Sequence, residues 1–416
     1  MATTTSTAPL RRVLASELPE RPFALAFWDG TRLAATGEGG PTVEVRSPRA
    51  LALALRAPGQ LGLGRAYVAG ELDAEALDDV IELIYRWHPP PVPLRARARL
   101  ALAAARAAGM TRTPARSAAE LRPNGGRRHD KQRDSRSVRH HYDVSNDFFA
   151  LFLDRSMTYS CALFRDGATT LEQAQQAKLE LIFRKLALAP GERLLDVGCG
   201  WGSLALHAAA RHGVRVVGIT LADRQAQLAR ERVREQGLED QVEIRVEDYR
   251  DLGDERFDAI ASIGMVEHVG EERIDEYAAT LARVLAPGGR VLNHGIAALG
   301  AGNDVPYEFT DRFVFPDGQL LHLPRVLAAL EGAGFEAVHV ESLHRHYEQT
   351  LAAWAQRLDE RLDDAIRIAG PERVRVWRLY LRAARENFRA GFASVYQVLC
   401  TPRWQGARRP AKARRP

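Results

Sequence analysis

The chain has 416 residues, of which 46% are apolar and 27% charged, so it is long enough for two or three domains with sizeable cores. Its three cysteines form neither a CxxC pair nor a metal-binding spacing, which excludes a disulfide framework, predicts no metal site and fits a reducing cytoplasm. The N-terminal stretch holds no apolar core with a cleavage site, and no run of about eighteen apolar residues occurs, so neither a signal peptide nor a membrane span is predicted.

Residues 1–110 are expected to form a small, separate α+β domain. The stretch FALAFWDGTRLAAT predicts a β-hairpin whose turn is formed by Asp29 and Gly30. The glycines of Gly62-Leu63-Gly64 resemble a phosphate-binding loop only weakly, because no helix is predicted to open there, and a structural role is favoured. The other predicted elements are a strand at 41–48, helices at 48–57 and 73–88, and a loop at 59–72.

Basic residues are concentrated in three segments of a chain whose net charge is +5. Residues 110–136 carry eight Lys and Arg against three acids, with Pro, Gly and Ser between them, so a mobile linker is predicted at 111–136. Residues 93–109 and the tail 401–416 are also basic. Solubilising charge, attraction to an anionic membrane at about 1 kcal/mol per basic residue, and attraction to nucleic acid all stay open, because charge alone does not choose between them.

Residues 137–400 are expected to form a doubly wound α/β domain. From Arg193 onward, buried strands alternate with amphipathic helices, a pattern that predicts a parallel, Rossmann-like sheet with helices on both faces. In such sheets, ligands bind at the carboxyl ends of the strands. The predicted strands are 193–197, 214–220, 241–249, 256–264 and 287–296, and a helix is predicted at 222–237.

A glycine turn follows the first of these strands. Gly198, Gly200 and Gly202 come shortly after Asp196, and glycines let the backbone approach a ligand closely. A dinucleotide site would show GxGxxG and leave a helix N-terminus for the pyrophosphate. The GxGxG spacing leaves no such turn, so it favours a cofactor without phosphate, S-adenosylmethionine, over a dinucleotide or a turn that serves packing alone.

Acidic residues after the next strands bear on recognition of the adenosine. Asp248, next to Tyr249, is placed to accept a hydrogen bond from the exocyclic amine of adenine. Many enzymes of this fold carry a carboxylate at the end of the second strand for the ribose hydroxyls, but here that strand ends at Thr220. Asp223 lies where a helix should start, and stabilising that helix N-terminus is the preferred interpretation of this residue.

Six motifs, in order along the chain, resemble those of one enzyme family. They are HHYDVSNDFFALFLDRSMTYSCALF, LLDVGCGWGSL, GITLADRQ, SIGMVEHVG, FVFPDG and HYEQTLAAW. Over about residues 138–398 the chain resembles the cyclopropane-fatty-acyl-phospholipid synthases and the mycolic acid cyclopropane synthases. The stretch LGLGRAYVAGELD weakly resembles the extra N-terminal domain of the phospholipid-acting members, so residues 1–110 would be an accessory domain.

The resemblance implies an S-adenosylmethionine-dependent methyltransferase that acts on the cis double bond of an unsaturated phospholipid acyl chain. The alkene attacks the methyl, a carbocation forms on the neighbouring carbon, and loss of a proton from the transferred methyl closes a cyclopropane. Such a site must exclude water, stabilise the cation and supply a base. The aromatic segment around Phe148, Phe149 and Phe152 is therefore expected to wall the acyl site, with core packing as the alternative for these rings.

The resemblance also assigns residues to the two sites. The base would be bound bicarbonate, and donors must surround it because the anion would otherwise be repelled by a neighbouring carboxylate. Its expected ligands are the backbone of Cys161 and of Ile296 and the side chains of Glu267, His294 and Tyr347, and Tyr142 would lie near the reacting carbons. The expected cofactor-binding residues are Tyr159, Ser160, Asp196, Gly198, Gly200, Gly202, Thr220, Leu221, Gln225, Asp248 and Tyr249.

The chain departs from the family pattern at two positions. Ala222 stands where Ser is common, and Gly295 stands where a small hydroxyl residue is common, so both are expected to loosen the local hydrogen bonding.

Amphipathic helices are predicted at 323–335, 351–370 and 375–392. They would complete the acyl site, or serve as core helices at most of their apolar positions.

The sequence therefore predicts a cytoplasmic enzyme, peripherally bound to the inner face of an anionic membrane, that cyclopropanates unsaturated phospholipid acyl chains. One alternative is the same methyl transfer giving a methylene-branched chain. A second, nucleic-acid methylation, is disfavoured because the sequence shows no NPPY-type tetrad and no RNP or KH motif, so no nucleic-acid partner is predicted. Chain length, double-bond position, headgroup and oligomeric state stay open, a homodimer included.

Overall fold

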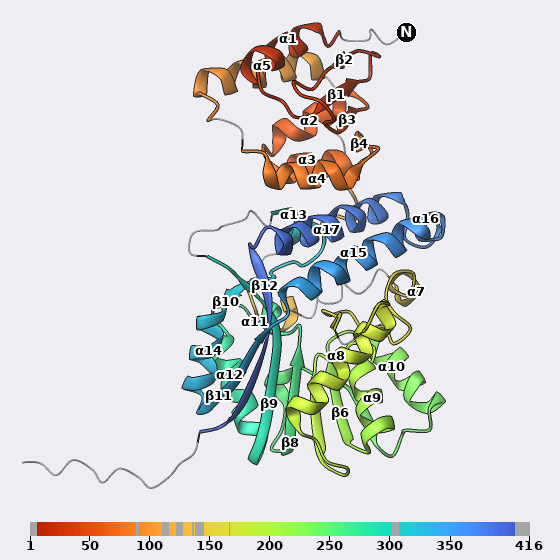
Figure 1. The fold of residues 1–416 in the computed structure, drawn as a ribbon, viewed down its shortest axis with the longest axis vertical. Helices are drawn as coiled ribbons and strands as arrows, with labels where there is room; N and C mark the ends of the chain where they lie inside the picture. Colours follow the sequence, from red (N-terminus) through yellow and green to blue (C-terminus); the bar gives the residue numbers. More distant parts are fainter. Residues whose placement is uncertain are drawn as a thin grey trace, which may run out of the picture.

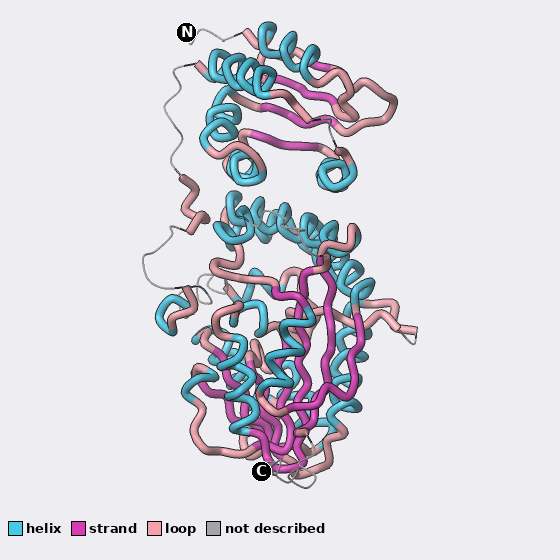
Figure 2. The backbone as a smooth tube through the Cα atoms, turned by 90° about the vertical axis from the view of Figure 1, so that its left-hand side faces the viewer, coloured by secondary structure: helices cyan, strands magenta, loops and turns pink. Residues whose placement is uncertain are grey.

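The computed structural model describes residues 6–88, 91–109, 116–121, 128–134, 137, 145–165, 167–300 and 308–403. The chain folds into a smaller N-terminal domain stacked on one end of a larger C-terminal domain (Figures 1 and 2). The N-terminal domain has a four-stranded sheet in the order β2-β1-β3-β4, and the C-terminal domain has an eight-stranded sheet. The predicted doubly wound α/β fold with a small N-terminal α+β domain is confirmed.

The N-terminal domain contains the predicted hairpin. Its two strands pair antiparallel, and the Gly30 amide donates to the Phe27 carbonyl across the turn, where Gly30 has a φ of 77°. The predicted third strand and both predicted helices are also present. The elements are α1 (Ala8–Glu17), β1 (Ala24–Phe27), β2 (Arg32–Leu33), β3 (Thr42–Val45), α2 (Pro48–Arg56), β4 (Leu72–Ala74), α4 (Leu77–Arg86) and α5 (Leu94–Ala108).

The loop predicted at 59–72 is wrong, because Gln60–Val68 forms helix α3. Its glycines are sites of close packing. A Cβ on Gly62 would lie 2.2 Å from a carbonyl oxygen at the end of α2, and a Cβ on Gly64 would lie 2.4 Å from the ring of Phe309. The packing that these glycines permit therefore overrides their low helix propensity, which costs about 1 kcal/mol per residue.

The large sheet has a parallel core. The strand order is β11-β12-β9-β8-β5-β6-β7, and β10 pairs with β9. β9, β8, β5, β6 and β7 run parallel, whereas β12 is antiparallel to both of its neighbours. All five predicted strands are present. The bounds are β5 (Arg193–Val197), β6 (Arg215–Thr220), β7 (Val242–Val246), β8 (Phe257–Ile263), β9 (Leu285–Ala298), β10 (Leu321–His322), β11 (Phe335–Ser342) and β12 (Ala393–Pro402).

Helices cover both faces of this sheet. On one face the apolar side chains of α8 (Leu171–Leu186), α9 (Ser203–His212) and α10 (Asp223–Glu235) share a buried cluster with the sheet. On the other face α12 (Ile274–Val284) and α14 (Leu323–Gly332) do the same. Shorter helices connect the strands: α7 (Asn146–Ala150), η1 (Tyr249–Asp251), α11 (Val266–Val269) and α13 (Glu308–Phe313).

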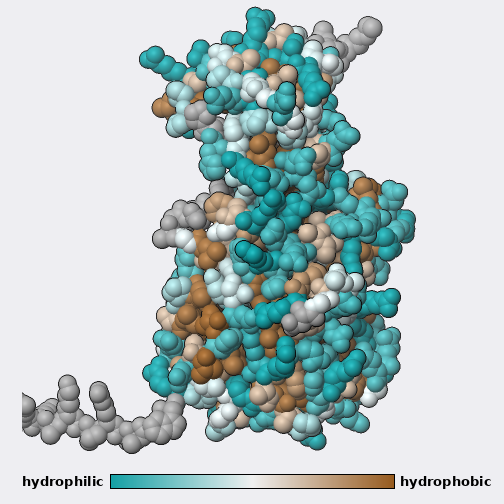
Figure 3. Space-filling model, in the orientation of Figure 1, coloured by the Kyte–Doolittle hydropathy of each residue, from teal (hydrophilic) through white to brown (hydrophobic). Residues whose placement is uncertain are grey.

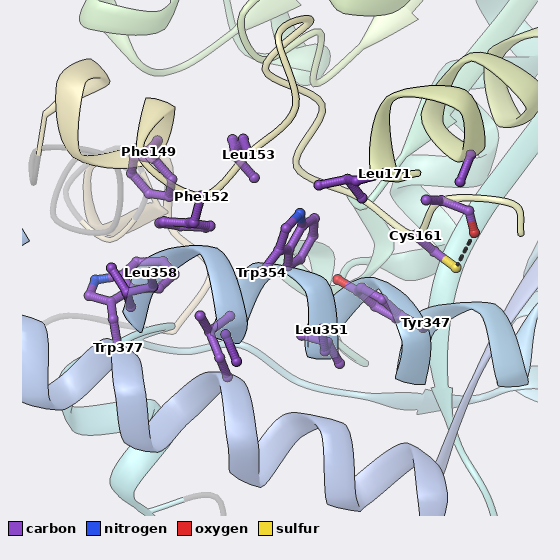
Figure 4. Close-up of a cluster of buried hydrophobic side chains, with 14 of the residues drawn as sticks. Phe149, Phe152, Leu153, Cys161, Leu171, Tyr347, Leu351, Trp354, Leu358 and Trp377 are labelled. Atoms are coloured by element: carbon purple, nitrogen blue, oxygen red, sulfur yellow. Dashed lines mark hydrogen bonds between the residues drawn. The ribbon is translucent and has the colours of Figure 1, made fainter. Parts of the chain in front are cut away.

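A third helical layer lies above the carboxyl ends of the strands, formed by α15 (His344–Glu360), α16 (Leu362–Ala369) and α17 (Pro371–Arg389) (Figure 1). Between it and the sheet lies a buried aromatic cluster, part of which is shown in Figure 4. Phe148, Phe149 and Phe152 are each 0% exposed and pack on one another and on Trp377. For these three rings, core packing is the role that the structure shows.

Helix α17 joins the two domains through ion pairs. Arg375 contacts Asp73 at 3.1 Å, and Arg382 and Arg385 each contact Asp78 at 2.8 Å. Arg382 is only 5% exposed, so its pair with Asp78 is partly shielded from water. The N-terminal domain is therefore docked directly onto the helical layer that covers the strand ends.

The molecular surface in Figure 3 is largely hydrophilic over the N-terminal domain and shows apolar side chains over the region of α14 and β11. Val338 and Val340 of β11, the edge strand of the large sheet, are 50% and 41% exposed. Across the described ranges, no helix combines the length and apolar character that crossing a bilayer requires.

Candidate active site

A cavity opens at the carboxyl ends of β5, β6 and β8, where doubly wound sheets bind their ligands. Gly202 is absent from its lining and has a different role, because a Cβ there would lie 3.2 Å from Ala229 of α10. This glycine permits close packing of two helices. The other predicted cofactor-binding residues all line the cavity: Tyr159, Ser160, Asp196, Gly198, Gly200, Thr220, Leu221, Gln225, Asp248 and Tyr249.

The glycine turn is built in a left-handed conformation. Gly198 has a φ of 78° and Gly200 a φ of 54°, values that residues with side chains rarely adopt. The amide of Gly198 donates to the carbonyl of Ile219 at 2.9 Å, which ties the turn to β6. Around Gly200 the structure leaves space, since the nearest atom to a Cβ placed there would be Nε2 of Gln225 at 4.0 Å. Because this space is open, a ligand can approach the backbone of Gly200 closely.

Two buried ionisable residues, Lys178 and Asp196, line the cavity. Lys178 and Asp196 are 1% and 2% exposed, and the Lys178 ammonium donates to Oγ of Ser160 at 2.9 Å. Burial raises the pKa of Asp196, which Lys178 partly offsets, and burial lowers the pKa of Lys178. Oδ2 of Asp196 is buried and has no hydrogen-bond partner among the described residues. The cavity thus offers an acceptor and a cation close together, the two groups that an amino-acid zwitterion requires.

The end of β6 is organised by side-chain hydrogen bonds. Thr220 Oγ1 donates to Oε1 of Gln225 at 3.0 Å and accepts from the Ala222 amide at 3.2 Å. Ala222 is the N-cap of α10 and provides no side-chain hydrogen bond to the helix N-terminus. Asp223 opens α10 as predicted, where its charge stabilises the helix N-terminus.

Asp248 is held by an arginine that the sequence analysis did not single out. Its Oδ1 accepts from the backbone amide and Nε of Arg250, and its Oδ2 accepts from Nη2 at 2.6 Å. Burial would raise the pKa of Asp248, but these hydrogen bonds outweigh it and lower the pKa. Arg250 also pairs with Asp134, which lines the cavity, so part of the predicted linker walls the site. A carboxylate has spare lone pairs, so Asp248 can still accept from adenine.

Other lining residues were also missed. Glu247 follows β7 and donates its amide to the carbonyl of Thr220, which places a carboxylate beside the strand end where one was expected and not found. Lys178 lies on α8, far from any motif that marks a cofactor site. The position of Glu247 directly after a predicted parallel strand was a signal that could have placed it in the site. A single lysine on an amphipathic helix, such as Lys178, offers no such signal.

The predicted base-binding residues come from four separate segments. Oε1 of Glu267 accepts a hydrogen bond from the Ile296 amide at 2.7 Å, which joins α11 to β9. Oε2 of Glu267 is buried without a hydrogen-bond partner in the described parts of the chain, and burial raises the pKa of Glu267 to about 7. This carboxyl group can therefore hold or release a proton near neutral pH, as an acid–base group must.

Two further members of the predicted base site come from other segments of the chain. Tyr347 of α15 and Cys161 belong to one buried cluster and lie close to each other in Figure 4. The segment that carries Cys161 is anchored to the same helix, because the Ala162 amide donates to Oγ1 of Thr350 at 3.0 Å. Ile296 packs against this cluster too, so the apolar wall and the polar contacts of Glu267 share one residue.

His294 lies two residues before Ile296 on β9 and is 3% exposed. Burial, aided by the charges of Lys178 and Lys185, lowers its pKa to about 3, so the imidazole is neutral at physiological pH. The structure leaves no free space beside Gly295. A Cβ on Gly295 would lie 2.3 Å from the Val266 side chain, so α11 packs directly on the strand and fills the space. Tyr142 falls outside the described residues.

The chain is similar to a known protein family. The family model described as mycolic acid cyclopropane synthetase matches residues 129–398. The chain belongs to this family. It is therefore an S-adenosylmethionine-dependent methyltransferase of the cyclopropane synthase type, as the motifs of the sequence indicated.

Several known proteins also resemble the chain individually. A probable fatty acid methyltransferase of Mycobacterium tuberculosis is 39% identical over 92% of this chain and 91% of its own. The cyclopropane-fatty-acyl-phospholipid synthase of Escherichia coli K12 is 34% identical over 88% and 89%. A crystal structure of a mycolic acid cyclopropane synthase with SAH and CTAB covers 64% of this chain and 97% of that chain, with 36% identity and a TM-score of 0.61.

Proposed function

We propose that this methyltransferase transfers the methyl carbon of S-adenosylmethionine to the cis double bond of an unsaturated phospholipid acyl chain and closes a cyclopropane ring. The observation that carries the proposal is the carboxyl of Glu267, which the Ile296 amide fixes while its Oε2 stays buried without a hydrogen-bond partner among the described residues. Ile296 lies two residues after the buried His294 and packs against the apolar cluster that contains Tyr347. A carbocation must be kept from water while one proton is removed, and this arrangement combines both conditions.

The residues around Glu267 fit a bound bicarbonate, which would supply the base for the transferred methyl. Glu267 need not repel it: with a pKa of about 7 the carboxyl can be protonated and donate from Oε2. Tyr347 and the backbone near Cys161 offer further donors. The Ile296 amide is already used by Oε1 of Glu267, so this residue acts by fixing the carboxyl rather than by holding the anion directly.

The cofactor proposal rests on the cavity at the glycine turn. The unpartnered oxygen of Asp196 suits the ammonium of the methionine moiety, and Lys178 with Ser160 suits its carboxylate. Asp248 and Glu247 flank the side on which an adenosine would lie. Ten predicted residues that meet in one cavity support S-adenosylmethionine as the ligand, and the crystal structure of a relative with SAH is consistent with it.

A methylene-branched product is the second candidate, favoured by the names of the relatives. Two fatty acid methyltransferases share 39% identity with this chain, and a tuberculostearic acid methyltransferase shares 31%, against 34% for the phospholipid cyclopropane synthase. Both products add one carbon and two hydrogens to the acyl chain. In the cyclopropane each carbon of the former double bond keeps its own hydrogen, whereas in the methylene-branched product both hydrogens are on one of these carbons. Isotope labelling can measure this difference.

We also propose that the enzyme works at the cytoplasmic face of an anionic membrane, with residues 1–110 as an accessory domain. The linker is a weaker candidate for contact than its charge suggested, since Lys131 pairs with Asp251 and Arg133 with Asp317. Helix α5 is better placed: Leu94 and Leu102 are 81% and 50% exposed on it. Exposed arginines flank them at positions 95, 97, 99 and 106, and of these Arg99 pairs with Glu17 at 2.7 Å, so the other three suit an anionic lipid surface best.

The test is lipid analysis of a bacterial host that lacks such an enzyme, expresses this one and is fed a mono-unsaturated fatty acid. Mass spectrometry should show phospholipid acyl chains that have gained one carbon and two hydrogens. The same host expressing a Glu267→Gln variant is the control. Unmodified lipids with the wild-type enzyme, or methylated nucleic acid instead, would contradict the proposal.

A further inference from the structure

A row of polar side chains crosses three neighbouring strands behind His294. In the sheet register, Glu341 of β11 lies opposite Gln397 of β12, and Gln397 lies opposite His294 of β9. Directly opposed residues in antiparallel strands project from the same face, about 4.5–5.5 Å apart. Lys185, in the last turn of α8, reaches into this row from above the sheet.

The row is joined by short contacts. The Lys185 ammonium lies 2.6 Å from Oε2 of Glu341 and donates to Oε1 of Gln397 at 2.7 Å. Nε2 of Gln397 then lies 3.2 Å from Nδ1 of His294. Gln397 is 0% exposed and the Lys185 side chain 9%, so water does not compete for these groups.

The donors and acceptors in this row can be arranged in only one way. An ammonium has donors and no acceptor, so the Gln397 atom that faces Lys185 must be the carbonyl oxygen. The amide NH₂ of Gln397 is thereby turned toward His294, and Nδ1 of His294 must accept. The proton of the neutral imidazole then resides on Nε2, and the far edge of the ring is a hydrogen-bond donor.

The charged residues Glu341 and Lys185, at the end of the row away from His294, stabilise this arrangement of donors and acceptors. Burial would raise the pKa of Glu341, but hydrogen bonds from Arg165 and Lys185 outweigh it and leave the pKa at about 2. Glu341 thus stays ionised and holds the ammonium of Lys185 against Gln397. Protonation of Nδ1 would bring two donors together, so the row also opposes the imidazolium form of His294.

We propose that Gln397 and Lys185 are positioning residues that fix His294 as a neutral Nε2–H donor. The inference rests on the proposed function, in which His294 donates to the bound base. A neutral donor of low acidity can hold an anion without neutralising it, so the anion keeps its ability to take a proton from the substrate. Neither Gln397 nor Lys185 lines the cofactor cavity, so both act through His294 alone.

The test is ¹⁵N NMR of the full-length protein with labelled histidine, without substrate. The signals of His294 are assigned by their loss in a His294→Gln variant, and they should show a neutral ring protonated on Nε2. In Gln397→Glu the new carboxylate accepts from Nδ1, so Nδ1 should gain a proton. Gln356→Glu, at an exposed position of α15, is the matched control and should leave the pattern unchanged.

Kinetics supply the second readout. Gln397→Glu should lower kcat by about 10-fold or more, the usual scale for a residue that orients another, while the KM for S-adenosylmethionine stays within about twofold. Lys185→Gln tests the same row without a new charge: Gln397 becomes free to turn, and both neutral tautomers of His294 should appear.

Three results would overturn the proposal: Nδ1–H in the wild-type protein, an unchanged tautomer in Gln397→Glu, or a changed tautomer with wild-type kcat. Failure of the proposed function has a different signature. In that case the tautomers would behave as described, but the wild-type enzyme would methylate no acyl chain.

Discussion

The cofactor cavity takes much of its lining from continuous stretches such as 157–160 and 196–201, whereas the residues proposed to bind the base come from four distant segments, one or two from each. The cavity is shaped by backbone, through glycines at positive φ. The proposed base cluster depends on side chains instead, and Oε2 of Glu267 is buried without a hydrogen-bond partner among the residues that the structure describes. The lining of the cofactor cavity is thus largely encoded locally, whereas the residues that we propose for proton removal are far apart in the sequence and depend on the tertiary fold.

The largest effect on activity is expected when the ionisable group of the proposed base cluster, the carboxyl of Glu267, is removed. In Glu267→Gln the amide keeps the contact with the Ile296 amide but cannot take up a proton. We expect turnover to fall by about 10²–10⁴-fold, the scale of a lost acid–base group. Calorimetric titration with S-adenosylmethionine should give wild-type affinity. Wild-type turnover would show that the carboxyl of Glu267 is structural only.

The same variant should be more stable than the wild type at alkaline pH. Folding raises the pKa of Glu267 from 4.5 to about 7, so its contribution to stability is complete below pH 4.5 and is lost as the pH rises through 7. A shift of this size corresponds to about 3 kcal/mol. Urea unfolding at pH 4.5 and pH 8 measures it. Glu267→Gln should gain on the wild type only at pH 8, and an equal difference at both pH values would contradict the raised pKa.

The proposal that the glycine turn shapes the cofactor cavity can be tested with two glycines that have similar backbone conformations. Gly200→Ala and Gly237→Ala both place a side chain at positive φ, 54° and 64°, and each should cost about 1–2 kcal/mol of stability. Only Gly200 lines the cavity, so only its variant should lose affinity for S-adenosylmethionine, by about tenfold or 1.4 kcal/mol. Equal affinities of the two folded variants would remove the glycine turn from the site.

The smallest effect is expected at the membrane, away from both sites. Leu94→Asp should weaken co-sedimentation with anionic vesicles a few-fold, since it removes an apolar contact and adds repulsion on α5. Ile84→Asp changes a side chain that is 60% exposed on α4 and serves as the control. Binding should also fall as salt rises. Equal loss in both variants, or equal binding to neutral vesicles, would exclude α5 as the contact.

The sequence was sufficient for most of the fold. Alternating strands and helices and the GxGxG turn are local patterns, and Gly198 and Gly200 line the cavity at the carboxyl ends of the strands. Prediction failed where distant packing decides the structure. Gly62 and Gly64 lie in a helix because α2 and Phe309 approach them. Lys185 and Gln397 are 212 residues apart, and no local pattern joins them.

The product of the reaction tests the central claim most directly. A mono-unsaturated substrate deuterated at both carbons of the double bond is converted, and the product lipid is examined by ¹H and ²H NMR. A cyclopropane forms when the transferred methyl loses a proton while each former alkene carbon keeps its own deuterium. We expect high-field cyclopropyl signals with deuterium on both ring carbons. An exocyclic methylene signal, with both deuterons on one neighbouring carbon, would contradict ring closure and establish the methylene-branched product instead.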